Sequence, residues 1–529
     1  MSDSTSRIPR HDALFALQLL PALTALGFGW WMLARRQYLL VDDAYISFRY
    51  AANFANGHGL VWNVGTPVEG YTCLLWVLLL SLFARAGLAL TLPGVTLSVL
   101  FGLGCLELLR RIDRMHAPAD STLAGIVPCM LLACLPSFAH AMTSAMEETC
   151  FAFFVLLGLH LLILGRTSLR LRLLSGLAFA GASLTRPEGP LVAGVALAVE
   201  AVQLSSWRLS LRRLAAPALC VAIVVFAHTA FRLAYYGYPL PNTFYAKVIF
   251  GPRTVMRGLA HLWAFCLAGG WMLLLGFPGR TLSSSARPWV VHGYAVAVTY
   301  CAYLLFVGGD HPHWFRFYIP LLPLPLLGLG LRLRAARHRG PWLQQRAWRQ
   351  PVAFGIGCIA LALAALPYSE AYEPIVGVID RPTKKLMDDV DEFFSQVPKH
   401  SFCAVAPIGH VGYRHLDLHI LDTWGLTDTH IAHLEVAPAV KFGHDKQDNA
   451  YVASMKPDYL YIFAFPPMPL PGYDLCWPSN NPPAAVYRRA MSLTAADVNL
   501  GVGHNQHRYL EPPPACRPPS FVPITAGRP

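Results

Sequence analysis

Charged residues are scarce in this 529-residue chain. Asp, Glu, Lys and Arg together make up 14% of the sequence, whereas about 25% is typical of a soluble domain. Apolar residues make up 55% and come in long uninterrupted runs. This composition excludes a purely soluble enzyme and a disordered chain, and it predicts a polytopic α-helical membrane protein.

The sequence also lacks the motifs of several enzyme classes. It contains no GxxxxGK[ST] phosphate loop, no GxGxxG after a predicted strand, and neither HExxH nor GxSxG. Nucleotide-driven transport and zinc-protease chemistry therefore lose their usual signatures. The net charge of +12 does not indicate nucleic acid, because the basic residues form short clusters between apolar runs, where they indicate membrane topology.

A membrane span needs about 20 apolar residues, and twelve runs are candidates. Basic residues in short loops favour the cytoplasmic side, but twelve crossings from a cytoplasmic N-terminus would put all five basic clusters outside. If the run 72–90, which Arg85 and Gly87 interrupt, does not cross, all five lie inside. We therefore expect about 11 transmembrane helices plus a re-entrant or interfacial helix in the first outer loop. The runs are 13–34, 72–90, 91–109, 122–140, 149–165, 172–185, 189–204, 214–233, 256–276, 288–307, 317–331 and 351–367, and the clusters lie near 110–114, 166–172, 208–213, 280–287 and 332–349.

This topology also places the polar loops of the chain on one side of the membrane. All five emerge on the outer face, so we expect the chemistry there. They are VDDAYISFRY (41–50), TSAMEET (143–149), LTRPEG (184–189), YYGYPLPNTFYAK (235–247) and GGDHPHWFRFYIP (308–320).

Hydropathy falls after about residue 369, and the sequence predicts two domains, a membrane domain over 1–368 and a soluble one over 369–529. Short β-like runs at Phe402–Pro407, Leu418–Leu421 and Tyr459–Ala464 follow a helix-like run at Lys384–Phe394, which favours a small α/β or α+β fold. We expect the proline-rich tail from 465 to be irregular. Cys476 and Cys516 can pair in an oxidising compartment, or both can stay free.

Asp42 and Asp43 follow the first span directly. Adjacent carboxylates repel, so a cation or a catalytic role is expected to compensate for the repulsion. Because neighbours in an extended segment point in opposite directions, one carboxylate can act as general base while the other holds a cation or the substrate. The structural alternative has equal weight: Asp42 caps a helix that begins near Tyr45 and pairs with Arg49.

Tyr45 and Arg49, which follow the acidic doublet, are also candidate substrate-binding residues. The rest of the first outer loop and the other outer loops supply further candidates, each with a structural alternative. Arg186 can bind phosphate through its fork of donors or form a local pair with Glu188. Glu69 and Tyr71 can line a polar pocket, or they can form a turn and an interfacial anchor. The aromatic loop suits an anionic lipid ligand or an ordinary aromatic belt, and a metal near residue 310 is less favoured because neighbouring residues seldom supply a complete ligand set. These last two loops contribute Asn242, Tyr245, Lys247, Asp310, His311 and Arg316.

The order of motifs DDAYISFRYAANFANGHGLVWN, VEGYT, LTRPEG, YYGYPLPNTFYAK and GGDHPHWFRFYIP resembles the GT-C class of polyprenyl-phosphate-dependent membrane glycosyltransferases. More closely, it is similar to the family of the mycobacterial terminal arabinofuranosyltransferase. LDTWGLTDTHIA (421–432) and the stretch 443–446 look like the C-terminal domain of that group. The resemblance covers about 30 to 460, and the tail after about 465 has no counterpart.

The resemblance implies an enzyme that moves a sugar, with D-arabinofuranose as first candidate, from a polyprenyl-phosphate donor to an extracytoplasmic glycan or protein such as pilin. It implies that Asp42 and Asp43 are catalytic, in a bacterial inner-membrane protein whose active site faces the periplasm. No cofactor is implied, and a divalent cation stays open. The alternatives are a lipid-linked sugar flippase or transporter, and a GT-C transferase for mannose or aminoarabinose; nucleic acid is not an expected partner.

Overall fold

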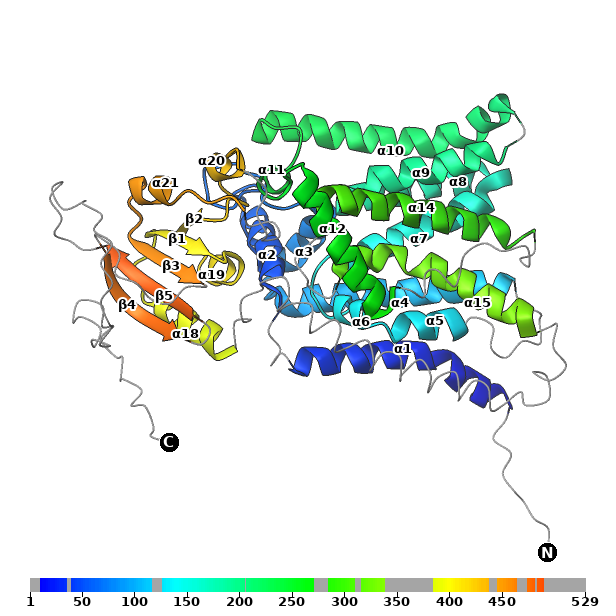
Figure 1. Cartoon of the computed structure of the whole chain (residues 1–529), viewed down its shortest axis with the longest axis horizontal. Helices are drawn as coiled ribbons and strands as arrows, with labels where there is room; N and C mark the ends of the chain where they lie inside the picture. The colour runs from blue at the N-terminus through cyan, green and yellow to red at the C-terminus, as the bar shows by residue number, and fades with distance from the viewer. Residues whose placement is uncertain are drawn as a thin grey trace, which may run out of the picture.

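The computed structural model consists of a helical bundle with an α/β domain at one end (Figure 1). It describes residues 10–35, 40–116, 126–204, 206–270, 284–309, 315–337, 384–436, 445–463, 473–480 and 483–489. The bundle helices are α1 (Arg10–Arg35), α2 (Asp42–Ala55), α3 (Leu74–Arg85), α4 (Thr91–Met115), α5 (Ile126–Ala133), α6 (Pro136–Ala141), α7 (Glu148–Leu164), α8 (Leu169–Thr185), α9 (Gly189–Val202), α10 (Trp207–Tyr236), α11 (Asn242–Lys247), α12 (Pro252–Phe265), α14 (Arg287–Val307) and α15 (Pro323–Arg337).

Within the described ranges, four stretches are long and apolar enough to cross a membrane: Thr91–Met115, Glu148–Thr167, Trp207–Tyr236 and Arg287–Val307. Shorter apolar helices cover Leu19–Ala34, Leu74–Arg85 and Gly189–Val202. The chain is a multi-pass membrane protein. The predicted count of 11 spans stays a prediction, and the run 351–367 lies outside the described residues.

The run 72–90, which we expect not to cross, forms the short helix α3 of 12 residues. At 1.5 Å per residue this helix is about 18 Å long, well below the roughly 30 Å of a bilayer core. Its length supports an interfacial or re-entrant position.

Two expected spans are interrupted by proline. The run 122–140 is not one helix: α5 ends at Ala133 and α6 begins at Pro136, because the residue before a proline is disfavoured in the helical conformation. The run 317–331 begins as a 3-10 helix, η3 (Arg316–Leu321), before α15. Pro320 and Pro323 lack the N–H groups that a continuous α-helix needs there.

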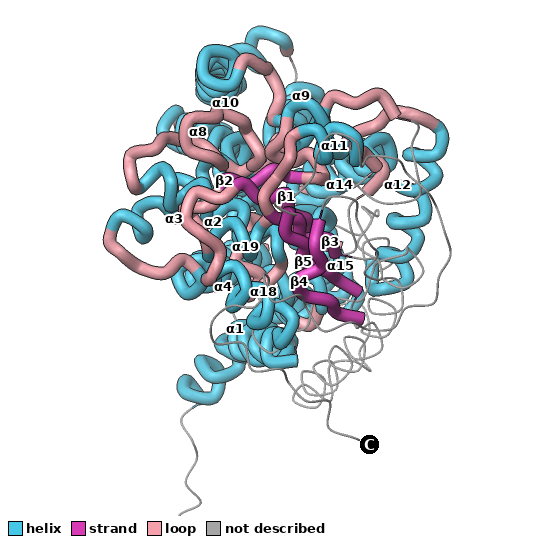
Figure 2. Tube along the Cα trace, turned by 90° about the vertical axis from the view of Figure 1, so that its left-hand side faces the viewer, coloured by secondary structure: helices cyan, strands magenta, loops and turns pink. Residues whose placement is uncertain are grey.

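The C-terminal domain is built on a five-stranded sheet in the order β2-β1-β3-β5-β4 (Figure 2). β1 pairs in parallel with β2 and β3, and β5 pairs antiparallel with β3 and β4. Its first three strands and first helix match the sequence prediction, but β4 and β5 lie in the tail that was expected to be irregular, so that expectation was wrong. The elements are α18 (Lys384–Ser395), β1 (Phe402–Ala406), α19 (Gly409–Arg414), β2 (His419–Asp422), α20 (Thr429–Ala432), α21 (Asn449–Ser454), β3 (Tyr459–Phe463), β4 (Tyr473–Asn480) and β5 (Pro483–Arg489).

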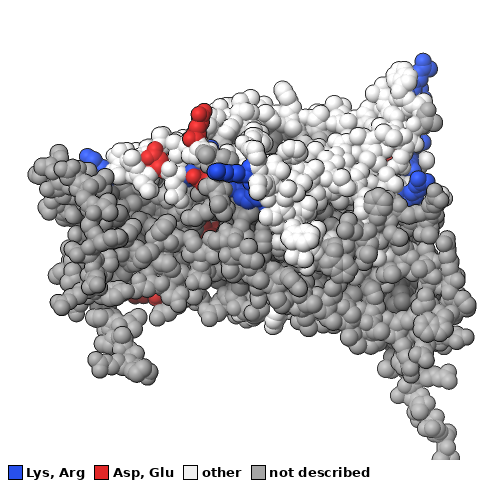
Figure 3. Space-filling model, viewed as in Figure 1, with Lys and Arg blue, Asp and Glu red and all other residues white. Residues whose placement is uncertain are grey.

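The two ends of the bundle differ. The helix α2, the helix α11 and their loops lie beside the C-terminal domain (Figure 1). On the face shown in Figure 3, Lys and Arg side chains lie at both ends of the described surface, and the white flank between the two ends shows no charged side chain. An uncharged belt between two charged ends is the pattern expected of a membrane bundle.

A single hydrophobic core extends across the junction between the first outer loop and the C-terminal domain. It includes Trp62 and Trp76 of the membrane domain together with Val405, Ile420 and Tyr461 of the sheet, all of them buried. At 0.8 kcal/mol or so per buried methylene group, such a shared core holds two domains together far more firmly than a flexible tether. The C-terminal domain is therefore packed against the outer loops.

Candidate active site

The acidic doublet begins the helix α2, whose N-cap is Val41. Both carboxylates lie in the first turn, where the exposed N–H groups of a helix favour negative charge. The expectation that the helix begins near Tyr45 with Asp42 as its cap was wrong. The doublet was argued from an extended segment, which was wrong, because both residues belong to the helix; their side chains nevertheless have different partners.

Asp42 is bound by the C-terminal domain. Its Oδ2 accepts a hydrogen bond of 2.7 Å from the backbone N–H of Gly409, and its Oδ1 accepts one of 2.8 Å from the backbone N–H of His410. Burial raises the pKa of Asp42 to about 7, the two N–H donors oppose that rise, and the charges of Asp43 and Asp422 add to it. Asp42 therefore titrates near neutrality.

Asp43 points to a different element, the 3-10 helix η3. Its Oδ2 lies 2.9 Å from Nη2 of Arg316, and 28% of the Asp43 side chain is exposed, against 4% of Arg316. Arg316 also contacts Sδ of Met146 at 3.4 Å. The residue before it, Phe315, has φ of 56°, a left-handed conformation that sets the direction in which η3 begins.

Arg186 lies at the break between α8 and α9, between two carboxylates. Its Nη1 contacts Glu147 at 2.8 Å and its Nε contacts Glu188 at 3.2 Å. The ring of Phe317 lies 4.3 Å from the Arg186 guanidinium and 5.4 Å from that of Arg316. Phe317 therefore connects the two arginines, and the local Arg186–Glu188 pair foreseen as the structural alternative is present.

Glu148 is the residue of this region that sequence reasoning missed, together with Glu147. Its Oε2 accepts a hydrogen bond of 3.0 Å from Ser144, while its buried Oε1 has no hydrogen-bond partner among the described residues. Both Arg316 and Arg186 act on its charge. The available signal was the acidic pair inside the outer loop 143–149.

These contacts define an acid–arginine cluster of four carboxylates and two guanidiniums at the end of the bundle beside the C-terminal domain. Asp43 is the member whose side chain keeps substantial exposure, so it is the carboxylate that a substrate can reach. In the described part of the chain, no three His, Cys, Asp or Glu residues are placed to hold a metal ion. The cluster consists of Asp43, Glu147, Glu148, Glu188, Arg186 and Arg316.

Arg49, a predicted substrate ligand, is 1% exposed and donates to backbone carbonyls. Its acceptors include Trp62 at 2.8 Å, Gly412 at 2.6 Å and Leu418 at 2.8 Å. The expected ion pair with Asp42 was wrong, because the guanidinium lies among carbonyls of the first outer loop and the C-terminal domain. Burial lowers the pKa of Arg49 to about 10.

Asn242 also binds the C-terminal domain. Its Nδ2 donates to the carbonyls of Gly425 at 2.9 Å, Leu426 at 3.1 Å and Asp428 at 3.2 Å. These carbonyls belong to the motif LDTWGLTDTHIA, whose loop is held by Asp422. The motif is therefore a docking loop for α11.

Glu69 and Tyr71 contact α10. Both carboxylate oxygens of Glu69 accept from Nε of Arg232, at 3.0 and 2.8 Å, and the hydroxyl of Tyr71 lies 3.0 Å from that of Tyr236. Burial raises the pKa of Glu69, and Arg232 opposes the rise. The pairs connect the first outer loop to the outer end of a membrane helix.

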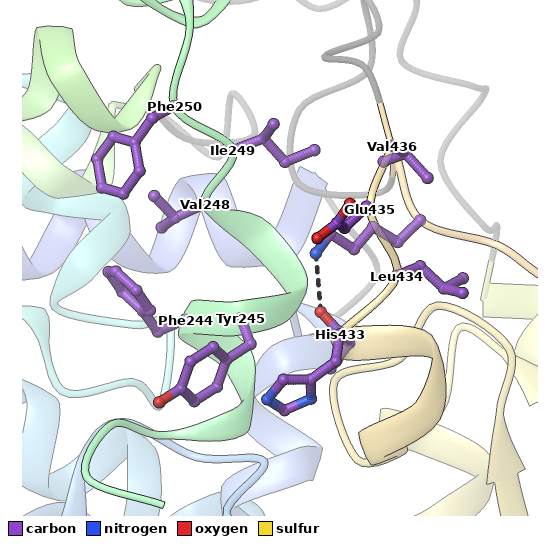
Figure 4. Close-up of a pocket in the computed structure, with 11 residues that line it drawn as sticks. Phe244, Tyr245, Val248, Ile249, Phe250, His433, Leu434, Glu435 and Val436 are labelled. Carbon is purple, nitrogen blue, oxygen red and sulfur yellow. Dashed lines mark hydrogen bonds between the residues drawn. The ribbon is translucent and has the colours of Figure 1, made fainter.

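A separate cavity of about 520 Å³ lies between α11 and the segment that follows α20 (Figure 4). Tyr245 stacks on His433 in its wall, with ring centroids 4.4 Å apart. Lys446 donates to the carbonyl of Ala432 at 2.8 Å. The other residues that line the cavity are mostly apolar, with the exposed Glu435 as the charged exception: Phe244, Val248, Ile249, Phe250, Leu434 and Val436.

The remaining candidates are placed as follows. Tyr45 is buried against the rings of His410 and Tyr413. Lys247 ends α11, and its side chain makes no hydrogen bond or ion pair with the described residues. The predictions for Asp310 and His311, and the pairing of Cys476 with Cys516, fall outside the described residues.

Comparison with known proteins gives one matching family model and a curated relative. Residues 382–501 match the family model of a domain of unknown function, DUF8728. A stretch of 251 residues, 45% of this chain, is 31% identical to the terminal β-(1→2)-arabinofuranosyltransferase of Mycobacterium tuberculosis. That stretch spans 39% of the length of the relative.

The solved structures extend the likeness to nearly the whole chain. ArnT from Cupriavidus metallidurans, bound to undecaprenyl phosphate, matches with a TM-score of 0.57 at 12% identity, over 91% of this chain and 98% of ArnT. The same protein in the apo state matches with a TM-score of 0.56 at 13% identity, over 90% and 97%. The chain has the GT-C fold. The resemblance seen in the GT-C motifs is thereby confirmed for the architecture.

Proposed function

We propose that this GT-C protein is a glycosyltransferase that moves a sugar from a polyprenyl-phosphate donor to an acceptor hydroxyl outside the cytoplasmic membrane. The observation that carries the proposal is the partly exposed Asp43 carboxylate, paired with Arg316 inside the acid–arginine cluster. The likeness to a protein named as an arabinofuranosyltransferase and to one solved with undecaprenyl phosphate supports the class of reaction and donor.

Asp43 is the general base in this proposal. The acceptor hydroxyl gives its proton to Asp43 while its oxygen bonds to the anomeric carbon of the sugar. The bond from that carbon to the phosphate oxygen breaks, and polyprenyl phosphate leaves with the electron pair. Because 28% of the Asp43 side chain is exposed, and both oxygens of Asp42 accept backbone N–H groups, we assign the base to Asp43 alone.

Arg316 and Lys247 are the cations that we assign to the donor phosphate. Arg316 already faces Asp43, and a phosphate developing negative charge is stabilised by such a guanidinium. Arg186 is not assigned to phosphate, because two carboxylates already occupy its donors. We infer structural roles for Arg186, Glu188, Arg49 and Asn242.

D-arabinofuranose is the first sugar to test, since the curated relative is named for it. The acceptor is a glycan or a protein such as pilin, reached from the periplasmic side of a bacterial inner membrane. The acid–arginine cluster, the C-terminal domain packed on the outer loops and the basic clusters of the opposite loops in the sequence support this orientation.

The decisive experiment incubates the purified protein in lipid nanodiscs with a panel of polyprenyl-phosphate sugars, arabinofuranose, mannose and aminoarabinose among them, and measures release of polyprenyl phosphate. The wild type should consume one donor. Asp43→Asn should lose turnover by a factor on the order of a hundred or more, as expected for removal of a general base, and keep donor binding. Asp417→Asn, at an exposed aspartate on the C-terminal domain, is the matched control and should keep wild-type turnover.

Two outcomes would contradict the proposal. Wild-type turnover in Asp43→Asn would reject Asp43 as the base. Movement of intact lipid-linked sugar across a vesicle membrane, without formation of a glycosidic bond or release of polyprenyl phosphate, would instead support a flippase.

A further inference from the structure

We propose that the C-terminal domain positions the catalytic carboxylate. The backbone N–H groups of Gly409 and His410 hold Asp42 so that Asp43 faces Arg316. This domain is the part of the chain that matches a domain of unknown function. This inference rests on the proposed function. It assigns Asp42 and Gly409 as positioning residues, while Asp43 remains the catalytic residue.

Both carboxylate oxygens of Asp42 are hydrogen-bonded to the C-terminal domain. Each oxygen accepts one backbone N–H, from Gly409 at 2.7 Å and from His410 at 2.8 Å. Two donors on consecutive residues fix the orientation of a carboxylate plane, and charge-assisted bonds of this length are the stronger kind. Since Asp42 is the first residue of α2, this contact fixes the start of the helix that carries Asp43.

Glycine is needed at position 409 for this approach. A Cβ atom added there would overlap the backbone carbonyl oxygen of Asp42 and lie 2.7 Å from its Oδ2. The backbone of the C-terminal domain therefore comes closer to Asp42 than any residue with a side chain allows. The same holds at Gly412, where a Cβ atom would overlap the ring of Trp62.

Three further polar side chains of the membrane domain bind the C-terminal backbone in the same way. Arg49 donates to Gly412, His415 and Leu418. Asn63 both donates to the carbonyl of Ile420 at 2.8 Å and accepts from its N–H at 3.0 Å. Asn242 donates to the loop that includes Gly425.

These contacts come from two different outer loops and converge on one domain. Backbone groups are the partners throughout, so the interaction depends on the exact path of the C-terminal chain more than on its side chains. A contact of this kind, over a shared apolar core, positions the doublet with little freedom. Displacement of a reacting group by about 1 Å can lower a rate on the order of a hundredfold.

The test compares Gly409→Ala with Gly194→Ala, the same chemical change at an exposed helical glycine whose added Cβ meets no atom within 4 Å. Donor turnover is measured with the polyprenyl-phosphate sugar that the wild type consumes. Hydrogen exchange is measured on the peptide that contains residues 409–410. Gly409→Ala should lower kcat on the order of a hundredfold at a nearly unchanged KM for donor, with faster exchange, whereas Gly194→Ala should match the wild type.

A second variant keeps the proposal testable if Gly409→Ala does not fold. Asp42→Asn keeps the size of the side chain but replaces one acceptor oxygen with an amide. It should lower kcat about tenfold, far less than Asp43→Asn, and it should remove the dependence of kcat on pH near 7.

The possible failures are distinct. If the wild type turns over no donor of the panel, the proposed function is wrong and the catalytic part of this inference is wrong with it. If the wild type is active and Gly409→Ala keeps wild-type kcat although exchange at residues 409–410 is faster, only this inference is overturned. An Asp42→Asn variant with the wild-type rate and pH profile would overturn it as well.

Discussion

Asp43 and Arg316 lie 273 positions apart in the chain, yet their side chains form an ion pair of 2.9 Å. One follows the first helix of the bundle and the other opens η3, after α14. Arg316 is nearly buried and Asp43 is partly exposed, so the pair presents the carboxylate toward solvent with the guanidinium behind it. This arrangement suits a base that must receive a proton next to a departing phosphate.

Removing the charge behind the base should lower activity. Arg316→Met should reduce kcat on the order of a hundredfold, because it removes the donor to Asp43 and the cation that stabilises phosphate. Arg316→Lys should recover part of this loss, since lysine restores the positive charge but not the planar set of N–H donors of the guanidinium. Arg85→Met, at an exposed arginine at the end of α3, is the control in the same turnover assay. Equal rates for wild type and Arg316→Met would show that the pair is not catalytic.

The pH dependence of kcat should follow Asp42. Burial raises the pKa of Asp42 to about 7. Below that pH the carboxyl is protonated and no longer accepts both N–H bonds as a carboxylate, so kcat should rise as the pH rises through about 7. The groups that influence it are Asp43 and Asp422 by charge, with Tyr45 and His410 in contact.

The same raised pKa has the opposite effect on stability. A carboxyl that binds its proton more tightly in the folded state than in the unfolded chain stabilises the fold most at low pH. The contribution of Asp42 is therefore present below about pH 4, the usual range of the unfolded side chain, and falls as the pH rises to about 7. Asp42→Asn should lose this slope in thermal unfolding. A wild-type slope in that variant would assign the titration to another group.

Arg49 should matter for folding rather than for substrate. Arg49→Met leaves buried carbonyls of Trp62, Gly412 and Leu418 without their donor, at about 1–3 kcal/mol for an unsatisfied buried group. We expect a clear fall in the midpoint of thermal unfolding and looser docking of the C-terminal domain, seen as easier proteolysis after residue 384. Arg85→Met should have the wild-type midpoint. A lower donor affinity at unchanged stability would instead support the substrate role that the sequence suggested for Arg49.

Arg186 neutralises two buried carboxylates, so the destabilisation caused by replacing Arg186 should depend on whether those carboxylates are charged. Arg186→Met should destabilise the protein by about 3–5 kcal/mol, the usual cost of breaking a buried pair from one side. Combining it with Glu147→Gln and Glu188→Gln should restore much of the folded yield, because no charge is then left unpaired. Size-exclusion profiles in detergent measure both variants. A triple variant no better folded than Arg186→Met would contradict the compensation.

The orientation can be tested by labelling from each side of the membrane. Single cysteines in place of the exposed His58 and Arg212 should react with a membrane-impermeant maleimide from opposite sides, His58→Cys from the periplasm. Reaction of both from one side would contradict the predicted topology.

The sequence predicted the local features of this fold well. Hydropathy located the helices, and alternation located β1, β2 and β3, because both follow from the residues of a single segment. The breaks at Pro136 and Pro320 were not foreseen, since a run of apolar residues hides where the backbone is interrupted. The strands β4 and β5 were missed because prolines near them suggested an irregular chain.

The candidate site was predicted only in part, for a physical reason. Charge and position selected Asp43, Arg186 and Arg316, which the structure brings into one cluster. The same signals selected Arg49 and Asn242, whose partners include backbone carbonyls more than 180 residues away. A polar residue in a loop has the same appearance in a sequence whether it meets a ligand or another domain, and a distant backbone partner leaves no pattern.

The bond between Asp42 and residues 409–410 also orders events during synthesis. The first helix and the acidic doublet leave the ribosome some 367 residues before Gly409. Throughout that interval Asp42 lacks its hydrogen bonds to residues 409–410, even after the early helices have entered the bilayer. If the proposed glycosyl transfer depends on this contact, a chain that has not yet reached Gly409 cannot carry it out.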